Sequence, residues 1–285
     1  MSKSTAHRVT AARMAELLGL NRAPRLKQAL KSMIDTLQDP LGRGVPLLVG
    51  GVEIRVPPRF ARAPWVNYET ISATQAAQWL AIRPDACFLD IGCSVGIYSL
   101  LTLAVAPRGT AYAFDSDLVS LKVTLRLCRH VGAERLRLIY GFIADKSQSA
   151  SELGAAARET DLLISRPEVA SDPGRTSFVC LDGQERPGIP VHSLDRLFPD
   201  ADSSRPWLLK CDVEGAEMLV LQGADQFVRR ARPQMLISVH DALAGFGFSK
   251  ADLARWIEDR GYTWRILAVD HEEHWWCDPL AASAN

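Results

Sequence analysis

Four charged residues lie close together in the segment 207 to 222, WLLKCDVEGAEMLVLQ, between two apolar runs. They are Lys210, Asp212, Glu214 and Glu217. If the first run is a strand of a nucleotide-type sheet, these side chains lie at its carboxyl end, where such sheets bind ligands. There they could orient a substrate hydroxyl, accept its proton or hold a divalent cation. Alternatively, Asp212 caps the following helix while Glu214 and Glu217 favour its positive N-terminal end.

Histidines supply the other candidates for proton transfer. His240 ends the run RPQMLISVH, and we predict it to be the base that deprotonates a substrate, with Asp212 as second candidate or as the group that orients it. The alternative is that His240 is only hydrogen-bonded at the end of a strand and takes no part in catalysis. His192, in the polar stretch before Lys210, could approach the substrate. His271 and His274 have a metal-binding spacing, but we predict a solvated edge and no metal there.

A second constellation follows the run CFLDI at 87 to 91. Gly92 and Gly96 form a strand-to-helix turn that lets backbone approach a ligand, although two glycines alone also suit an ordinary turn. Asp90 would repel a diphosphate at this turn but attract the amino group of a methionine moiety. Asp115 ends the next apolar run, where its carboxylate could accept hydrogen bonds from ribose hydroxyls.

The ligand that fits both acids is S-adenosylmethionine. Dinucleotide binding is less favoured, because the third glycine of G-x-G-x-x-G is missing and Asp90 lies close to the turn. We expect a further contact, with the adenine, from Ala144 and Asp145 after the third strand, although Asp145 could equally be a solvated loop acid.

The order of elements predicts an α/β fold with a doubly wound, mostly parallel, seven-stranded Rossmann-like sheet. Apolar runs predict six of the strands, near 87–91, 110–114, 136–140, 207–211, 234–239 and 263–269. Helices are predicted over 74–82, 96–105, 117–131, 215–230 and 249–260.

The first sixty residues are predicted to be an extension of two short helices over 9–38 and a hairpin over 40–58, which is turned by a glycine pair at 50 and 51. Residues 61–285 then form the catalytic domain. Trp65, Tyr68 and Glu69 could form a lid over the cofactor, and Trp275 with Trp276 could either close over an apolar substrate or be buried against the sheet.

The run LLKCDVEGAEMLVLQGA resembles the K-x-D-V-E-G-A-E-x-x-V-L-x-G-A signature of FkbM-type methyltransferases. VHSLDRL, RPQMLISVH and FLDIGCSVGIYSL extend the resemblance from about residue 46 to 262. It implies that Asp90, Gly92, Gly96 and Asp115 bind S-adenosylmethionine, and that the acids after Lys210 line the active-site edge. The typical reaction of the family is O-methylation of a sugar, polyketide or similar secondary metabolite.

Three departures from the family pattern stand out. The glycine loop reads GCSVG where G-A-N-x-G is usual, and F-D-S replaces F-E-P around Asp115. Ser238 stands where the family often has a glutamate before the histidine, so one polar contact to substrate or metal is expected to be missing.

Composition narrows the class of partner. Hydrophobic residues make up 47% and charged residues 23%, and 33 basic residues balance 33 acidic ones, which gives no surplus for nucleic acid or anionic lipid. The six scattered cysteines form no CxxC pair, and there is no apolar run of signal or membrane length. We expect a cytoplasmic protein with reduced thiols and a small hydroxylated acceptor. Self-association is left open.

The function predicted from the sequence is therefore methyl transfer from S-adenosylmethionine to a hydroxyl of a small metabolite, with a divalent metal as an optional second cofactor. Two alternatives stand beside it, an NAD-linked oxidoreductase and a cofactor-binding scaffold that has lost its chemistry.

Overall fold

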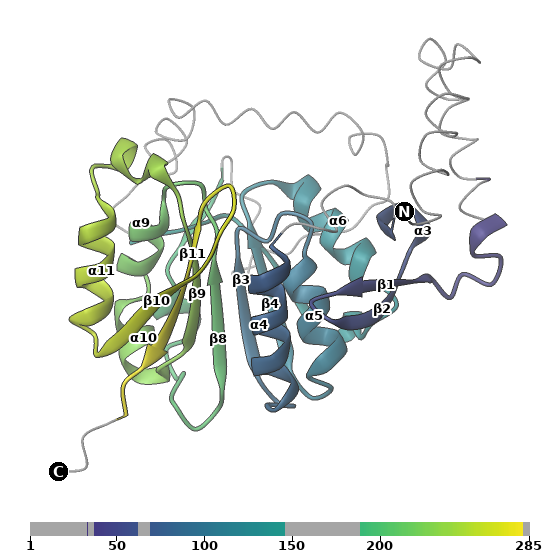
Figure 1. Cartoon of the computed structure of the whole chain (residues 1–285), viewed down its shortest axis with the longest axis horizontal. Helices are drawn as coiled ribbons and strands as arrows, with labels where there is room; N and C mark the ends of the chain where they lie inside the picture. Colours follow the sequence, from purple (N-terminus) through teal and green to yellow (C-terminus); the bar gives the residue numbers. More distant parts are fainter. Residues whose placement is uncertain (1–32, 34–36, 62–68, 146–188, 282–285) are drawn as a thin grey trace, which may run out of the picture.

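The computed structural model describes residues 33, 37–61, 69–145 and 189–281. Its centre is a seven-stranded sheet in the order β10-β11-β9-β8-β3-β4-β5 (Figure 1). The strands are β3 (Cys87–Ile91), β4 (Thr110–Asp115), β5 (Leu136–Tyr140), β8 (Trp207–Cys211), β9 (Gln234–Val239), β10 (Tyr262–Val269) and β11 (Glu273–Pro279).

The middle of this sheet is parallel, and β11 alone runs against its neighbours β9 and β10. Every residue of β3, β8 and β9 is buried, as expected of strands covered on both faces. The predicted doubly wound, mostly parallel, seven-stranded sheet is confirmed.

The seventh strand, β11, lies in a segment where we predicted no strand from the sequence. We predicted a solvated polar edge at 271–274, but β11 is inserted between β9 and β10, so His274, Trp275 and Trp276 are buried at 0%, 2% and 2% exposure. Trp275 stacks on Trp264 at 4.0 Å, which confirms burial against the sheet as the reason for the tryptophan pair.

The direction of the chain's connections reverses between β3 and β8. The chain passes from β3 to β4 to β5 on one side and then returns to place β8 beside β3. Connections leaving two adjacent strands in opposite directions open a ligand crevice at the strands' carboxyl ends. The segments after Ile91 and after Cys211 therefore meet at one edge.

Helices cover both faces of the sheet (Figure 1). One cluster of buried residues joins α4 (Thr70–Ala81), α5 (Ile97–Val105) and α6 (Leu118–Cys128) to the sheet. The other face carries α8 (Leu194–Leu197), α10 (Asp225–Ala231) and α11 (Lys250–Glu258).

The single helix predicted over 215–230 is two helices in the structure, α9 (Glu217–Gln222) and α10. They are separated at Gly223. A Cβ at Gly223 would lie 2.4 Å from the Ala144 carbonyl oxygen, so the backbone there packs too closely for a side chain.

Shorter elements complete the chain: α3 (Pro58–Ala61), β6 (Phe142–Ile143), β7 (Val191–His192) and the 3₁₀ turns η3 (Ala133–Arg135) and η4 (Asp241–Phe246). Within the described ranges, no helix is long and apolar enough to cross a membrane. Five cysteines, Cys87, Cys93, Cys128, Cys211 and Cys277, are free and buried.

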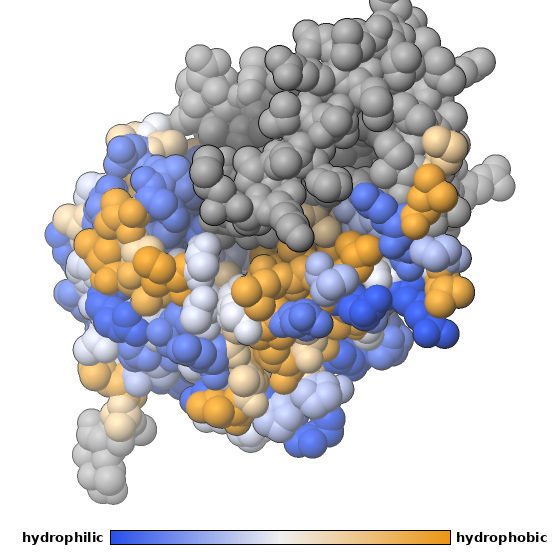
Figure 2. Space-filling view, turned by 45° about the vertical axis from the view of Figure 1, so that its right-hand side comes forward, coloured by the Kyte–Doolittle hydropathy of each residue, from blue (hydrophilic) through white to orange (hydrophobic). Residues whose placement is uncertain are grey.

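The predicted hairpin is present as β1 (Val45–Val49) and β2 (Val52–Val56), with both turn glycines at positive φ. Its inner side chains join the same core as α4 and α5. Large hydrophobic side chains are also exposed on these elements, among them Leu48 (66%) and Ile71 (58%). Figure 2 shows hydrophobic residues gathered among hydrophilic ones on the face turned toward the viewer.

Several predictions fall outside the described residues. These are the N-terminal helices over most of 9–38, the residues Trp65 and Tyr68 of the predicted lid, and the greater part of the polar stretch from 145 to 205. The domain boundary near residue 60 stays a prediction.

Candidate functional site

The turn after β3 has the conformation that its glycines predict. Gly92, Ser94 and Gly96 all have positive φ, at 76°, 53° and 78°. A Cβ on Gly92 would lie 1.7 Å from the carbonyl oxygen of Asp212, and a Cβ on Gly96 would lie 2.3 Å from the Thr124 side chain. Both glycines are thus required by contacts within the protein itself, which hold the turn against β8 and α6.

Asp90 lies beneath this turn. Its carboxylate is 1% exposed, and Oδ2 accepts hydrogen bonds from the backbone N–H of Ser99 at 3.1 Å and from the Ser99 hydroxyl at 2.6 Å. Burial raises its pKa to about 6, although Lys210 and the Ser99 hydrogen bonds oppose the rise. The geometry supports a role in holding the start of α5; direct contact with a cofactor would require this carboxylate to be uncovered.

Asp115 ends β4 and is half-buried. One oxygen accepts the Ser94 N–H at 2.9 Å and the other accepts the Asp117 N–H at 2.8 Å. The Cys93 thiol also donates to the first of these oxygens at 3.9 Å. A positive-φ turn beside a carboxylate at the end of the second strand is the arrangement in which nucleotide-type sheets hold a ribose.

The residues predicted to contact adenine follow β5. Ala144 is fully buried, and its N–H donates to the His192 carbonyl at 2.9 Å, whereas Asp145 is exposed. His192 places Nε2 3.0 Å from the carbonyl oxygen of Tyr140. These contacts put His192 beside the end of β5, among the residues predicted to bind cofactor rather than in the group around His240.

His240 gathers the predicted acids around its ring. Nδ1 lies 2.7 Å from Oε1 of Glu217, which also accepts the Gly215 N–H at 2.9 Å. Nε2 faces Glu214 Oε2 at 3.3 Å and Asp212 Oδ1 at 3.7 Å. The structure therefore brings His240 together with the three acids that follow Lys210 in the sequence.

Helix capping does not explain this arrangement. Helix α9 begins at Glu217, its N-cap is Ala216, and no side chain caps it. Asp212 instead pairs with Lys210. Glu217 does lie in the first turn of α9, as the alternative expects of it, and accepts the Gly215 N–H there.

Lys210 is a buried partner of the acids, only 3% exposed. Its Nζ lies 2.6 Å from Asp212 Oδ2, 3.9 Å from Glu69 Oε2 and 4.8 Å from the centre of the Tyr98 ring. Burial opposes its charge, but the carboxylates outweigh burial and raise its pKa, while Lys210 in turn lowers the pKa of Asp212 against the effect of burial. Lys210 thus holds Asp212 ionised, and Glu69 is held by the Tyr98 hydroxyl at 2.6 Å.

A fourth carboxylate beside His240 was missed from the sequence. Glu272 Oε2 lies 3.6 Å from His240 Nε2, and the Glu272 side chain is 3% exposed. Burial and the charge of Asp212 raise its pKa to about 7. It belongs to the segment at 271–274 that we considered for its histidines alone. The continuous apolar run WWC that follows this segment was the available signal for a strand.

Glu272 is also relevant to Ser238, which stands where the family often has a glutamate. Ser238 is fully buried and pairs across the ladder with His274, so its hydroxyl points to that ring at 3.2 Å. A carboxylate still reaches His240, but from the turn before β11 instead of from β9.

The carboxylates around His240 set the protonation state of its ring. Burial disfavours the charged form of His240, but the Glu217 hydrogen bond and the charges of Glu217, Asp212 and Glu214 outweigh it, raising the pKa to about 9. Burial raises the pKa of Glu214, which remains 45% exposed and is the most accessible of the four acids around the ring.

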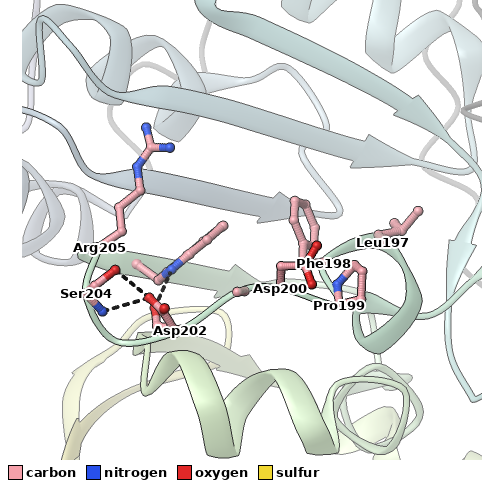
Figure 3. A pocket seen from close by; sticks show the side chains of 9 residues that line it. Leu197, Phe198, Pro199, Asp200, Asp202, Ser204 and Arg205 are labelled. Carbon is pink, nitrogen blue, oxygen red and sulfur yellow. Dashed lines mark hydrogen bonds between the residues drawn. The ribbon is translucent and has the colours of Figure 1, made fainter.

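A surface hollow lies elsewhere (Figure 3). Its lining runs from Leu197 to Trp207 and includes Phe198, Asp202 and Arg205. Trp207 begins β8 and Asp212 follows its end, so the hollow lies at the opposite edge of the sheet from His240. It has no part in the arrangement described above.

Comparison with known proteins finds a family model that matches part of the chain. Residues 142–263 match the family model described as "Methyltransferase FkbM domain". This segment includes the whole acid-rich motif and His240, so the match supports the resemblance found in the sequence.

Two curated relatives match parts of the chain. AMB antimetabolite synthetase AmbE of Pseudomonas aeruginosa is 26% identical over 195 residues, which are 61% of this chain and 9% of the relative. Ribosomal RNA small subunit methyltransferase H of Chromobacterium violaceum is 30% identical over 119 residues, which are 40% of this chain and 36% of the relative. The chain thus spans much less than two thirds of either relative.

Solved structures include a methyltransferase FkbM from Methylobacillus flagellatus, 17% identical, with a TM-score of 0.42, covering 68% of this chain and 44% of that one. TrmK of M. capricolum in complex with S-adenosylhomocysteine is 10% identical, with a TM-score of 0.35, covering 73% of this chain and 70% of that one.

Proposed function

We propose that this chain is an FkbM-type methyltransferase and transfers the methyl group of S-adenosylmethionine to a hydroxyl of a small metabolite such as a sugar or polyketide. The observation that carries the proposal is the contact between its two motifs: the backbone of Asp212 packs directly on Gly92. The cofactor turn and the acids around His240 therefore share one edge of the sheet.

The cofactor site would be formed by the residues around the turn after β3. Asp115 ends β4 beside this turn, at the position where a carboxylate can accept hydrogen bonds from ribose hydroxyls, and the positive-φ turn exposes backbone at the strand end. When bound, S-adenosylmethionine supplies an electrophilic methyl group. Asp90 supports the turn from below through its hydrogen bonds to Ser99.

The acceptor side would be formed by the acids around His240. An alcohol is a poor nucleophile, so its proton must leave as the oxygen–methyl bond forms and the sulfur–methyl bond breaks. Glu214 is placed to take that proton, because it is accessible and burial raises its pKa. His240, fixed by Glu217, would position Glu214 and the hydroxyl. Asp212 is held ionised by Lys210 and would orient the ring from the side facing Gly92.

Secondary metabolism is the favoured source of the acceptor. The balanced charge of the chain offers no overall attraction for nucleic acid. One relative is named an antimetabolite synthetase, which is in keeping with a small acceptor, and another is named a ribosomal RNA methyltransferase, so RNA is the substrate to compare.

The test has two stages. S-adenosylhomocysteine should raise the melting temperature of the purified chain, and NAD should not. Metabolite extracts incubated with enzyme and methyl-labelled cofactor should then yield a product with the mass of one added labelled methyl group.

Glu214→Gln should lower the rate of methylation by about 10²–10⁴ and leave the melting shift unchanged. Asp241→Asn is the matched control, because Asp241 follows His240 directly but its side chain is 97% exposed. Labelling of RNA instead of small molecules, or a full rate in Glu214→Gln, would contradict the proposal.

A further inference from the structure

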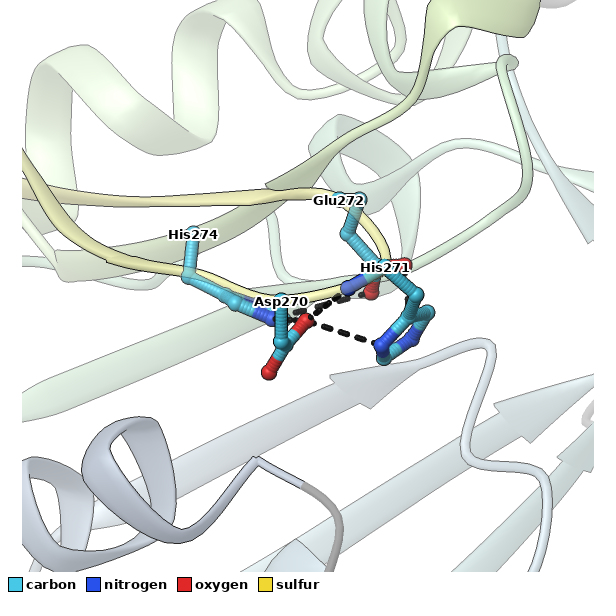
Figure 4. Close-up of side chains that lie close together, drawn as sticks. All are labelled: Asp270, His271, Glu272 and His274. Carbon is cyan, nitrogen blue, oxygen red and sulfur yellow. Dashed lines mark hydrogen bonds and ion pairs between the residues drawn. The ribbon is translucent and has the colours of Figure 1, made fainter.

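The turn that joins β10 to β11 gathers two imidazoles and two carboxylates. Asp270, His271, Glu272 and His274 each offer a ligand atom, and these atoms lie within 4.8 Å of one another. Figure 4 shows the four side chains on this turn, with the ring of His271 and the carboxylate of Asp270 directed toward each other. The group formed by Asp212, Glu214 and His240 is separate, and Glu272 is the member of the cluster that approaches it, 3.6 Å from His240 Nε2.

His274 is presented in the way that metal-binding histidines usually are. Its ring is fully buried, and Nδ1 lies 3.2 Å from the hydroxyl of Ser238 on the neighbouring strand. Nε2 is left facing Asp270 Oδ1 at 3.0 Å and Glu272 Oε1 at 3.8 Å. A partner on one ring nitrogen that fixes which way the other points is the common outer contact of a histidine ligand.

The carboxylate of Glu272 supplies a second, independent observation that points to a ligand at this cluster. Its side chain is 3% exposed, yet Oε1 is buried without a hydrogen-bond partner. Leaving a carboxylate oxygen unpaired in the interior is costly, and such atoms commonly mark an unfilled ion or water position. The other oxygen, Oε2, lies 2.6 Å from His271 Nε2, so the carboxyl group is directed into the cluster.

We propose that this turn binds one first-row divalent metal ion of the zinc class through Asp270, His271, Glu272 and His274. Two nitrogen and two carboxylate ligands suit zinc and its neighbours, whereas magnesium and calcium prefer oxygen alone. Four protein ligands leave no open coordination position in a tetrahedral site, so the ion is structural.

The bound ion fixes the turn between β10 and β11. It thereby holds Glu272 beside His240, 3.6 Å from Nε2. The proposal does not depend on methyl transfer, because metal binding is measured without any methyl acceptor or cofactor.

The experiment uses the full chain stripped with a chelator and reloaded with Zn²⁺ or Co²⁺. We expect about one equivalent of tightly bound metal per chain by elemental analysis, and tetrahedral d–d absorption with Co²⁺. His271→Ala and Asp270→Asn should abolish both signals; these side chains are 51% and 38% exposed, so the variants should fold. Ser238→Ala should weaken binding about 10- to 100-fold.

Two controls locate the ion. His130→Ala removes a histidine outside the cluster, and Asp212→Asn alters the neighbouring acid group; both should retain one equivalent of metal. No tight binding to the wild-type chain, retention of metal in His271→Ala and Asp270→Asn, or loss of metal in Asp212→Asn would each overturn the proposal.

Discussion

The carbonyl oxygen of Asp212 occupies the space in which a side chain on Gly92 would begin, with only 1.7 Å between that oxygen and an ideal Cβ. This contact joins the turn after β3 to the acids after β8 without any side chain between them. The backbone hydrogen bond from the Asp212 N–H to the Ile91 carbonyl, 3.0 Å long, extends the pairing of the two strands to the same point. Their relative position is therefore set by the sheet itself.

Gly92→Ala should be severely destabilising and should abolish the melting shift caused by S-adenosylhomocysteine. The substitution combines the unfavourable φ of 76° with an overlap against backbone that cannot rotate away. Gly51→Ala is the matched control, since Gly51 has a φ of 78° and nothing within 4 Å of its Cβ position. We expect about 1–2 kcal/mol for Gly51→Ala and clearly more for Gly92→Ala, measured by urea unfolding. If both variants lost the same free energy of unfolding, the overlap between the new Cβ in Gly92→Ala and the Asp212 carbonyl would have no energetic cost.

Lys210→Met should lower the free energy of unfolding by about 3–5 kcal/mol, because it leaves Asp212, Glu69 and Asp90 without their buried cation. Adding Asp212→Asn to this variant should restore part of the loss. Lys250→Met is the control: Lys250 pairs with Asp241 and Glu273, but its side chain is 38% exposed, so the effect should stay below about 1 kcal/mol. A Lys210→Met protein as stable as the wild type would refute the ion-pair account.

Asp90 should make the protein less stable as the pH rises from about 4 to 6. Its pKa is about 6 in the folded chain, against an ordinary value of 3.8, so the folded state holds this proton more tightly than the unfolded state does. Stability from this group is complete below pH 4, falls by about 3 kcal/mol as the pH passes 6, and is then constant.

Asp90→Asn should remove this part of the pH dependence, because an amide oxygen can still accept from Ser99 but does not titrate. Urea unfolding at several pH values measures it, with the exposed residue Asp200 changed to Asn as control. Identical slopes for wild type and Asp90→Asn between pH 4 and 6 would contradict the assignment.

Ile54→Ala tests whether the hairpin β1–β2 is part of the catalytic domain's core. Ile54 is 3% exposed and belongs to the hydrophobic cluster shared with α4 and α5, so we expect a loss of about 2–5 kcal/mol in one cooperative transition. Leu48→Ala, on the outer face of the same hairpin at 66% exposure, should change stability by no more than about 0.5 kcal/mol. A separate early transition for the hairpin, seen by calorimetry, would mark it as an appended unit.

The sequence by itself determined the elements whose signals are local. Continuous apolar runs predicted β3, β8 and β9 because strands buried on both faces carry no alternation, and a strand-helix order predicted the doubly wound sheet. The run of acids after Lys210 predicted the catalytic edge, since parallel strands end at the same side of a sheet.

Only the tertiary structure decided which of those side chains face one another. Glu272 reaches His240 because β11 enters the sheet between β9 and β10, a pairing between segments more than thirty residues apart that no local pattern encodes. Likewise the carboxylate of Asp90 is turned to Ser99, and Lys210 is buried against Asp212, because burial leaves charged groups stable only where a partner is in reach. Periodicity specifies which residues are buried, whereas strand order and register specify what each buried group meets.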